Sequence, residues 1–270
     1  MRRSCFTLVE LLVVIATITL LIAISLSSLQ SSRQQAKAVL CSSNVKQLTF
    51  ALFMYETQNQ TLPYGFNVKC DIKGNPIKPP GGYPGNSAFD RKGWWWFNYT
   101  SDYSGKERGK KTIPWCPSRS IQDPKFDYVL HGNYGVNYSI CKSSDDIPSH
   151  REEFVGTPLC SDDIPHPGQT LLIVDSGYSI ISWWHATDAP PVALGNAVIE
   201  DTAYVPGLEI NKKRDFWPGQ EEDAINGRHP NKTVNVGFVD NHGDKVKAES
   251  LFVEKTADGY KNKSPLWLPK

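Results

Sequence analysis

The sequence predicts an α+β fold in which one long N-terminal helix packs on an antiparallel β-sheet with long loops. Residues 6–60 contain no Gly and no Pro, so nothing in this stretch interrupts a helix. The second half of the stretch carries apolar residues at helical spacing, which indicates a face that packs on a domain. Short β-rich segments occur only further along the chain, so helix and sheet are segregated in sequence.

The first half of this helix, residues 6–29, is almost wholly apolar and contains no Lys or Arg. About 20 such residues in a helix match the roughly 30 Å hydrocarbon core of a membrane. Glu10 interrupts the apolar run. A charge at membrane depth costs on the order of 3 kcal/mol or more, so Glu10 needs a partner and is a candidate functional residue.

A short basic leader precedes the apolar run and suggests what that partner is. If the chain is cut between Cys5 and Phe6, the new ammonium of Phe6 lies one helical turn from Glu10, and it can also pair with Glu10 of a neighbouring copy. The alternative is an ordinary signal anchor with an incidental glutamate. Arg2 and Arg3 would hold the leader in the cytoplasm and place the rest of the chain on the far side.

Residues 6–15, FTLVELLVVI, resemble the prepilin-type cleavage and methylation motif of type IV pilins and type II secretion pseudopilins. The resemblance implies that a prepilin peptidase removes residues 1–5, that Phe6 becomes N-methylated, and that Glu10 guides assembly into a filament. It also implies a single pass through the bacterial inner membrane, with an extracytoplasmic C-terminal domain. The family usually has Gly before the cut, where this chain has Cys5.

The second half of the helix is predicted to pack on the globular domain through one apolar stripe. The stripe consists of Cys41, Val45, Leu48, Leu52 and Tyr55. The helix is expected to end near Asn59, before the Leu-Pro-Tyr-Gly sequence at 62–65. The chain therefore divides into a leader (1–5), a long helix (6–60) and a globular domain (61–270).

Strands in the globular domain are predicted from β-rich or alternating segments. The expected strands lie at 134–138, 170–175, 178–184, 233–239 and 244–248. Segment 178–184 is expected to form a hairpin with 170–175, and residues 240–243 a type I′-like turn. Segments 67–93 and 186–230 are expected to be loops.

The C-terminal part also resembles a large group of bacterial pilin-like proteins. The segments that carry this resemblance include residues 116–118, 134–137, 171–176 and 236–240. The group ends in a His, nine residues and Asp-Gly. Here ten residues separate His229 from Asp240, and Asn241 stands where Gly is expected.

The charge and the cysteine content limit which partners and which cellular compartment are expected. The chain has 29 basic and 28 acidic residues, which indicates no nucleic-acid partner. Loss of Cys5 leaves five cysteines, and on an oxidising side two disulfides and one free thiol are the simplest count. Because Cys41 lies in the predicted helix, the disulfides are expected among the other four. These are Cys70, Cys116, Cys141 and Cys160. Five reduced, mostly buried thiols are the alternative.

Other clusters favour structural over chemical roles. His229, Asp240 and His242 could hold a metal, but a turn with a hydrogen-bonded His229 is the preferred interpretation. Acidic pairs at 145–146 and 162–163 are expected to be solvated rather than calcium ligands. The Trp runs at 94–96 and 183–184 are expected to fill the core rather than to form a sugar-binding platform. No catalytic motif is found, so no enzyme activity, metal or cofactor is expected.

These observations predict a pilin-like or pseudopilin structural subunit of a type IV pilus-like or type II secretion filament. Its expected partners are the prepilin peptidase, other pilin-like subunits and the inner membrane. The alternative is a membrane-anchored extracytoplasmic binding protein, for example for polysaccharide. A tethered enzyme rests only on the His229 and Asp240 pair.

Overall fold

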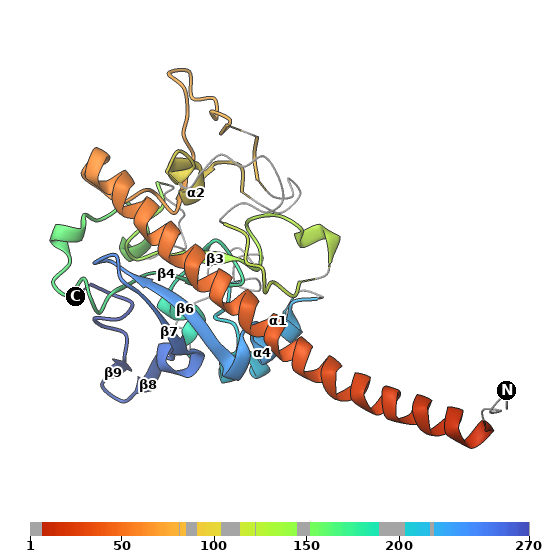
Figure 1. The fold of residues 1–270 in the computed structure, drawn as a ribbon. Helices are drawn as coiled ribbons and strands as arrows, with labels where there is room; N and C mark the ends of the chain where they lie inside the picture. The colour runs from red at the N-terminus through yellow and green to blue at the C-terminus, as the bar shows by residue number, and fades with distance from the viewer. Residues whose placement is uncertain are drawn as a thin grey trace.

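The structure is a computed structural model, and it has the α+β class that the sequence predicts. It describes residues 7–80, 82–84, 91–103, 114–121, 123–144, 152–188, 203–216 and 219–269. A single long helix lies against a five-stranded sheet, and short helices, turns and loops complete the domain (Figure 1).

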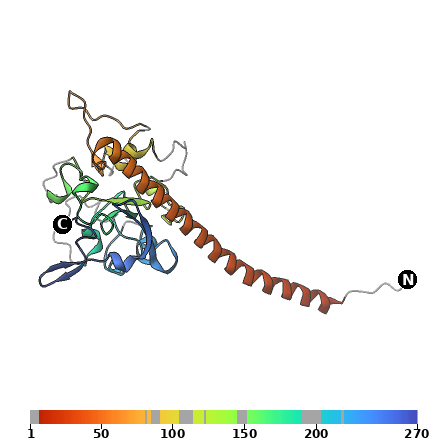
Figure 2. The same ribbon diagram turned by 60° about the vertical axis from the view of Figure 1, so that its left-hand side comes forward.

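Helix α1 spans Leu8–Asn59 without a break. This confirms the predicted helix over all of its described residues. The helix ends at Gln60, which adopts a left-handed conformation with φ 62° and donates its backbone N–H to the carbonyl of Glu56. The first half of α1 projects away from the domain, whereas the second half lies along it (Figures 1 and 2).

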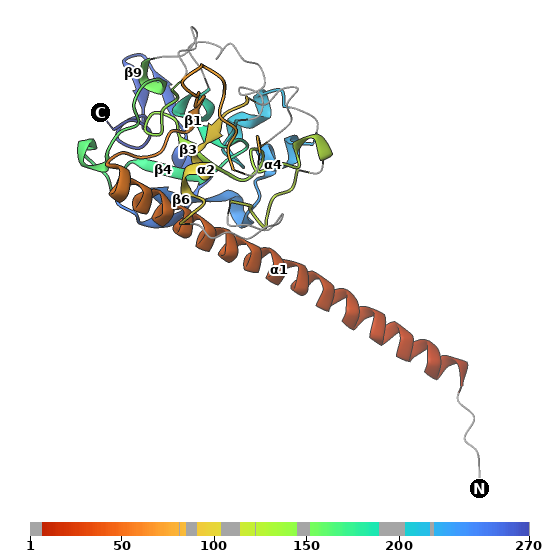
Figure 3. The same cartoon turned by 90° about the horizontal axis from the view of Figure 1, so that it is seen from above.

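The predicted apolar stripe of α1 is the face that meets the domain. Cys41, Val45, Leu48 and Leu52 are buried, and Tyr55 is half-buried. The stripe packs over strands β4 (Leu171–Asp175), β6 (Thr233–Phe238) and β7 (Gly243–Lys247), and this side-by-side placement is visible from above (Figure 3). Helical spacing read from the sequence therefore identified the contact face correctly.

The main sheet has the order β5-β3-β4-β6-β7. Strand β3 spans Tyr134–Asn137 and β5 spans Ile180–Ile181. The pairs β3–β4, β4–β6 and β6–β7 are antiparallel, and β3–β5 is parallel. Two small antiparallel pairs lie outside this sheet. They are β1 (Phe66–Asn67) with β2 (Trp94–Trp95), and β8 (Glu254–Thr256) with β9 (Gly259–Lys261).

Short helices fill the long connections. The α-helical ones are α2 (Trp96–Thr100) and α4 (Glu221–Asn226). The 3₁₀ turns lie at Pro124–Phe126, Glu152–Phe154, Ser161–Asp163, Trp183–Ala186, Glu209–Lys213, Pro230–Lys232 and Ala248–Leu251. The expected loop at 186–230 therefore contains α4 and a 3₁₀ turn within its described part.

The predicted hairpin between 170–175 and 178–184 is wrong. Strand β4 is central and pairs with β3 on one edge and with β6 on the other, so neither edge is left for a hairpin partner. Segment 178–184 instead supplies β5, which lies parallel to β3. Pairing between strands that are far apart in the sequence decides which strand segment 178–184 lies beside. A local sequence pattern carries no information about such pairing.

The predicted hairpin of β6 and β7 is confirmed, but its turn differs from the expected type. Asn241 donates its backbone N–H to the carbonyl of Phe238, and Phe238 donates to the carbonyl of His242. Only Asn241 has positive φ in this turn, at 71°, whereas a type I′ turn needs two such residues. The loop is a type I turn followed by a left-handed residue. Asn tolerates that conformation best after Gly.

Gly237 of β6 leaves room for Thr49 of α1 to lie directly against the strand. A Cβ at Gly237 would lie 2.1 Å from Oγ1 of the buried Thr49. No real side chain fits at that distance, so the helix and strand can pack here only because residue 237 is Gly.

The tryptophans of both runs serve the core. Trp95, Trp96, Trp183 and Trp184 are buried, and Trp94 is half-buried. The indole N–H of Trp96 donates to the carbonyl of Ser179, 2.9 Å away. The two runs therefore confirm the core-filling interpretation and leave no exposed stacking platform at these positions.

Candidate functional site

Two regions contain the candidate functional residues, and the first is the start of α1. Glu10 forms a capping box with Thr7: its Oε2 accepts from the backbone N–H and the hydroxyl of Thr7, both at 2.8 Å. In return, the N–H of Glu10 donates to the Thr7 hydroxyl, 3.2 Å away. The carboxylate thus satisfies groups that a helix start leaves unpaired. Cys5 and Phe6, the predicted cleavage residues, lie outside the described residues.

The large apolar side chains that follow Glu10 are exposed in the monomer. Leu12, Ile15, Leu21 and Leu26 are each at least half exposed. Within the described residues, α1 is the one helix long and apolar enough to cross a membrane. Leaving so many large apolar side chains in water is unfavourable, so this face needs a lipid or protein environment.

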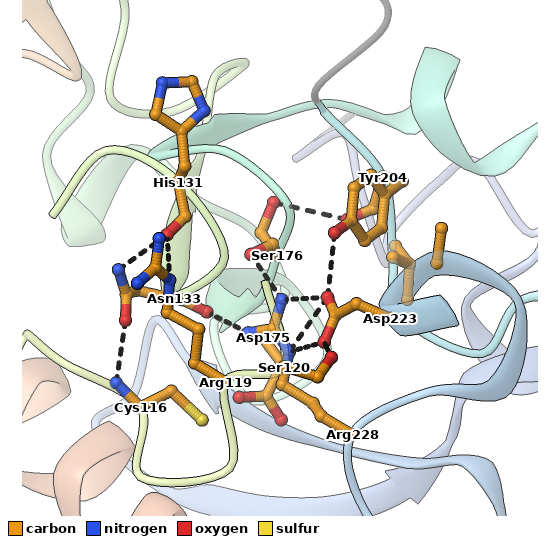
Figure 4. Close-up of polar contacts among 12 residues, drawn as sticks. Cys116, Arg119, Ser120, His131, Asn133, Asp175, Ser176, Tyr204, Asp223 and Arg228 are labelled. Atoms are coloured by element: carbon orange, nitrogen blue, oxygen red, sulfur yellow. Dashed lines mark hydrogen bonds and ion pairs between the residues drawn. The ribbon is translucent and has the colours of Figure 1, made fainter. Parts of the chain in front are cut away.

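The second region is a polar cluster inside the domain, centred on Arg228 and Asp223 (Figure 4). Arg228 Nη2 lies 2.7 Å from Asp223 Oδ2, and its Nε donates to Oδ1 at 3.0 Å. Both side chains are fully buried. A buried charge is tolerated only when it is paired and hydrogen-bonded, and this pair meets both conditions.

The pair holds several distant segments together through its remaining hydrogen bonds. Arg228 donates to the backbone carbonyls of Asn133, at 2.6 Å, and Ser176, at 2.9 Å. Asp223 accepts from the hydroxyls of Tyr204, at 2.8 Å, and Ser120, at 2.9 Å. Segments from five parts of the chain therefore meet at one ion pair.

His229, the next residue, forms a second buried group with Asp175 and Asn235. His229 Nε2 lies 3.1 Å from Asp175 Oδ2, which also accepts the backbone N–H of Asn235 at 2.6 Å. Burial by itself would lower the pKa of His229, but the facing Asp175 carboxylate outweighs it and raises the pKa to about 9. The imidazole is thus held in place with its other nitrogen, Nδ1, lacking a hydrogen bond.

Two cysteines lie beside His229. The sulfur of Cys41, on α1, is 2.8 Å from the sulfur of Cys116, in the segment 114–121. A hydrogen bond from the Cys116 thiol lowers the pKa of Cys41, and His229 contributes in the same direction. The backbone N–H of Cys116 donates to the Asn133 side chain at 2.8 Å, so the polar cluster fixes its position.

These residues include the one group in the described part of the chain with the makings of a metal site. One ligand atom from each of Cys41, Cys116 and His229 lies within 4.8 Å of the other two. The predicted alternative, His229 with Asp240 and His242, does not assemble. His229 is buried against Asp175, whereas Asp240 and His242 contact each other in the exposed β6–β7 turn.

The cysteine prediction needs correction. The described cysteines are all unpaired thiols, and no two of the four expected partners are joined. Cys116 faces Cys41, the residue that was set aside because it lies in the helix. It does so because Cys41 belongs to the buried stripe of α1. Cys70 is exposed and Cys141 is buried.

The two acidic pairs, at 145–146 and 162–163, were expected to be solvated. Asp162 and Asp163 are exposed in a 3₁₀ turn, which confirms the predicted exposure of this pair. Residues 145–146 lie outside the described residues.

Sequence reasoning missed the roles of Asp175, Asp223 and Arg228. A signal was present for two of them, because Asp175 ends an apolar strand segment and Arg228 directly precedes the candidate residue His229. Asp223 lies only five residues before Arg228, but the burial that makes this ion pair central is set by the fold.

Comparison with known protein families, with curated proteins and with solved structures finds no match for this chain.

Proposed function

We propose that this chain is a pilin-like or pseudopilin subunit, which a prepilin peptidase processes before Phe6 and which assembles into a filament through α1. The observation that carries the proposal is the division of α1. Its first half is apolar, exposed and contains a single acidic residue, Glu10, whereas its second half packs on a domain. Such a helix fits a subunit that moves from a lipid bilayer into a core of stacked helices.

The acidic residue has a specific role in this proposal. In the uncut chain the Glu10 carboxylate caps its own helix through Thr7. Cutting before Phe6 creates an ammonium one turn away, which gives Glu10 a charged partner in its own chain or in a neighbour. An unpaired carboxylate in a helical core is strongly disfavoured, so this pairing would fix the axial register of subunits.

The processed N-terminus tests the first step. We expect mass spectrometry of the protein from cells with a prepilin peptidase to show a chain that begins at N-methylated Phe6. An intact Met1 would contradict the proposal and favour a simple membrane anchor.

Filament incorporation tests the second step. We expect Glu10→Ala to be processed normally but to be lost from sheared filaments or from cross-linked multimers. Leu11→Ala, the neighbouring substitution without a charge change, is the control and should still be incorporated. Equal incorporation of the two variants would refute the role of Glu10.

A further inference from the structure

We propose that Cys41 and Cys116 form a disulfide that fastens the long helix to the globular domain. Cys41 belongs to α1, and Cys116 belongs to the segment 114–121, 75 residues further along the chain. The inference rests on the proposed function for the oxidising compartment in which the domain would lie and for the mechanical role of the bond in a filament. The geometry of the pair is independent of it.

Geometry is the first argument. The two sulfur atoms lie 2.8 Å apart, both side chains are buried, and they come from separate segments that face each other. A disulfide requires the two sulfur atoms to approach to about 2.05 Å, which is closer than their separation here by less than 1 Å. All five described cysteines are thiols in this structure, so the proposed bond is one that forms when Cys41 and Cys116 are oxidised.

The alternative to a disulfide is a zinc ion bound by the two cysteines. The 2.8 Å distance between their sulfur atoms argues against zinc. Two thiolates bound to one tetrahedral zinc at about 2.3 Å each lie roughly 3.8 Å apart. A structural zinc site also closes with four ligands. Beyond Cys41, Cys116 and His229, the group offers the hydroxyl of Ser118, 3.6 Å from the Cys41 sulfur, and a serine is not a usual zinc ligand.

The surroundings suit the chemistry of disulfide formation. The Cys41 thiolate would attack one sulfur of a disulfide-bearing oxidant, which releases the other oxidant sulfur as a thiol after it takes a proton. The Cys116 thiolate then attacks the Cys41 sulfur, forms the Cys41–Cys116 bond and expels the second oxidant thiol. The two cysteines lose two protons and two electrons, and the oxidant disulfide gains both.

His229 is placed to assist this exchange. In the docked domain its imidazole is fixed by Asp175 and lies within 4.8 Å of both sulfur atoms, so it can act only in the second step, when Cys116 attacks the Cys41 sulfur. Because both cysteines are buried in the folded domain, the mixed disulfide must form before α1 has fully docked. Docking then brings Cys116 onto Cys41 and completes the bond.

The cross-link would give the subunit a mechanical property. In a filament, the first half of α1 would be held by its neighbours, so a pulling force on the domain is transmitted through the contact between α1 and the sheet. A covalent bond near the start of that contact prevents the helix from peeling away, whereas the apolar stripe by itself resists only through packing.

Peptide mapping of the full-length chain tests the proposal. The protein is produced in a bacterium with a prepilin peptidase, trapped in acid, denatured without reductant, alkylated with N-ethylmaleimide and digested with trypsin. Cys41 and Cys116 fall in separate tryptic peptides, 38–46 and 112–119. We expect these two peptides to be linked and two hydrogens lighter than their sum, and the Cys141 peptide to be alkylated.

Two variants supply the controls. Cys41→Ser should abolish the linked pair and expose Cys116 to the maleimide, whereas Cys141→Ser, which removes another buried thiol, should leave the link intact. Alkylation of both Cys41 and Cys116 in the parent protein after release of bound zinc by a chelator would overturn the disulfide in favour of a metal site.

A second arm separates this inference from the proposed function. The purified, reduced full-length chain in detergent is refolded from denaturant with glutathione disulfide, and the same peptides are examined. A Cys41–Cys116 link that forms here but not in cells supports the pairing and contradicts the proposed compartment. The absence of this link in both arms, or preferential pairing of Cys116 with another cysteine, overturns the inference.

Discussion

The two halves of α1 have similar helical geometry but opposite surroundings. Leu40 and Leu48 lie only two turns apart, and yet the exposed fraction of Leu40 is 55% and that of Leu48 is 0%. Towards the N-terminus, Leu20 and Leu21 are more than 60% exposed. The domain therefore accounts for the burial of only one stripe on one half of the helix.

The difference shows that the two halves of one helix can have sequences suited to two different surroundings. The second half alternates apolar and polar positions because it has one partner, the sheet. The first half is apolar all round, which is the pattern of a helix surrounded by lipid or by other helices. Variants that affect one half and not the other can therefore test the division.

The largest expected effect comes from removing the first half. A fragment of residues 31–270 should be a soluble, folded monomer, because it keeps the buried stripe and loses the continuous exposed apolar surface of residues 8–29. The full chain should instead need detergent or membrane. Size-exclusion chromatography and circular dichroism check this outcome. Aggregation of the fragment would show that the domain depends on the missing half.

Within that fragment, Leu48→Asp should prevent folding, because it places an unpaired carboxylate against the sheet. Losing the leucine typically costs about 2–5 kcal/mol, and burial of the charge adds to this. Thermal melting is the measurement. Leu40→Asp is the matched control on the same helix and should leave the melting temperature close to that of the parent. Similar melting of both variants would mean that the stripe is not a contact face.

The surface on which α1 rests depends in turn on the buried polar cluster. Asp223→Asn leaves the Arg228 charge buried without a counter-ion, so it should destabilise the fragment by about 3–5 kcal/mol. Glu209→Gln makes the same chemical change in an exposed pair with Lys212 and should leave the free energy of unfolding nearly unchanged, because solvent screens that pair. Urea unfolding compares the two. Equal losses would contradict a central role for the Arg228–Asp223 pair.

A smaller effect should appear with pH, through His229 beneath α1. Its pKa is raised to about 9 in the folded protein, above the usual value of about 6.5. The Asp175 contact therefore contributes fully below about pH 6.5, and its contribution falls as pH rises through about 9, by up to about 3 kcal/mol. Urea unfolding at pH 6.5 and 9.5 measures the loss.

Thiol titration has to be removed from that experiment, so it uses the fragment with Cys41→Ala and Cys116→Ala. Cys41 also raises the pKa of His229, so the loss in this fragment should be smaller than the limit above and should occur at a lower pH. Adding His229→Gln to this background should flatten the pH dependence between the two values. A slope that persists in the His229→Gln protein would assign the effect to another group.

The sequence by itself determined the long helix, its division into two halves and its contact stripe. These follow from the absence of Gly and Pro in residues 6–60 and from apolar spacing, both of which are local properties. It also located β4, β6 and β7, whose patterns span only a few residues each. The sequence also identified Glu10, near the start of α1, as a candidate functional residue. Only the structure shows that Glu10 caps the helix through Thr7.

The tertiary structure decided which distant residues meet. It placed β5 beside β3, brought Arg228 to the carbonyls of Asn133 and Ser176, and brought Cys41 to Cys116. None of these contacts has a local signature, because each joins segments whose separation along the chain carries no information about their distance in space. The cysteine prediction failed for this reason. Cys41 was excluded as a partner because it lies in a helix, but only the packing of that helix shows that Cys41 faces Cys116.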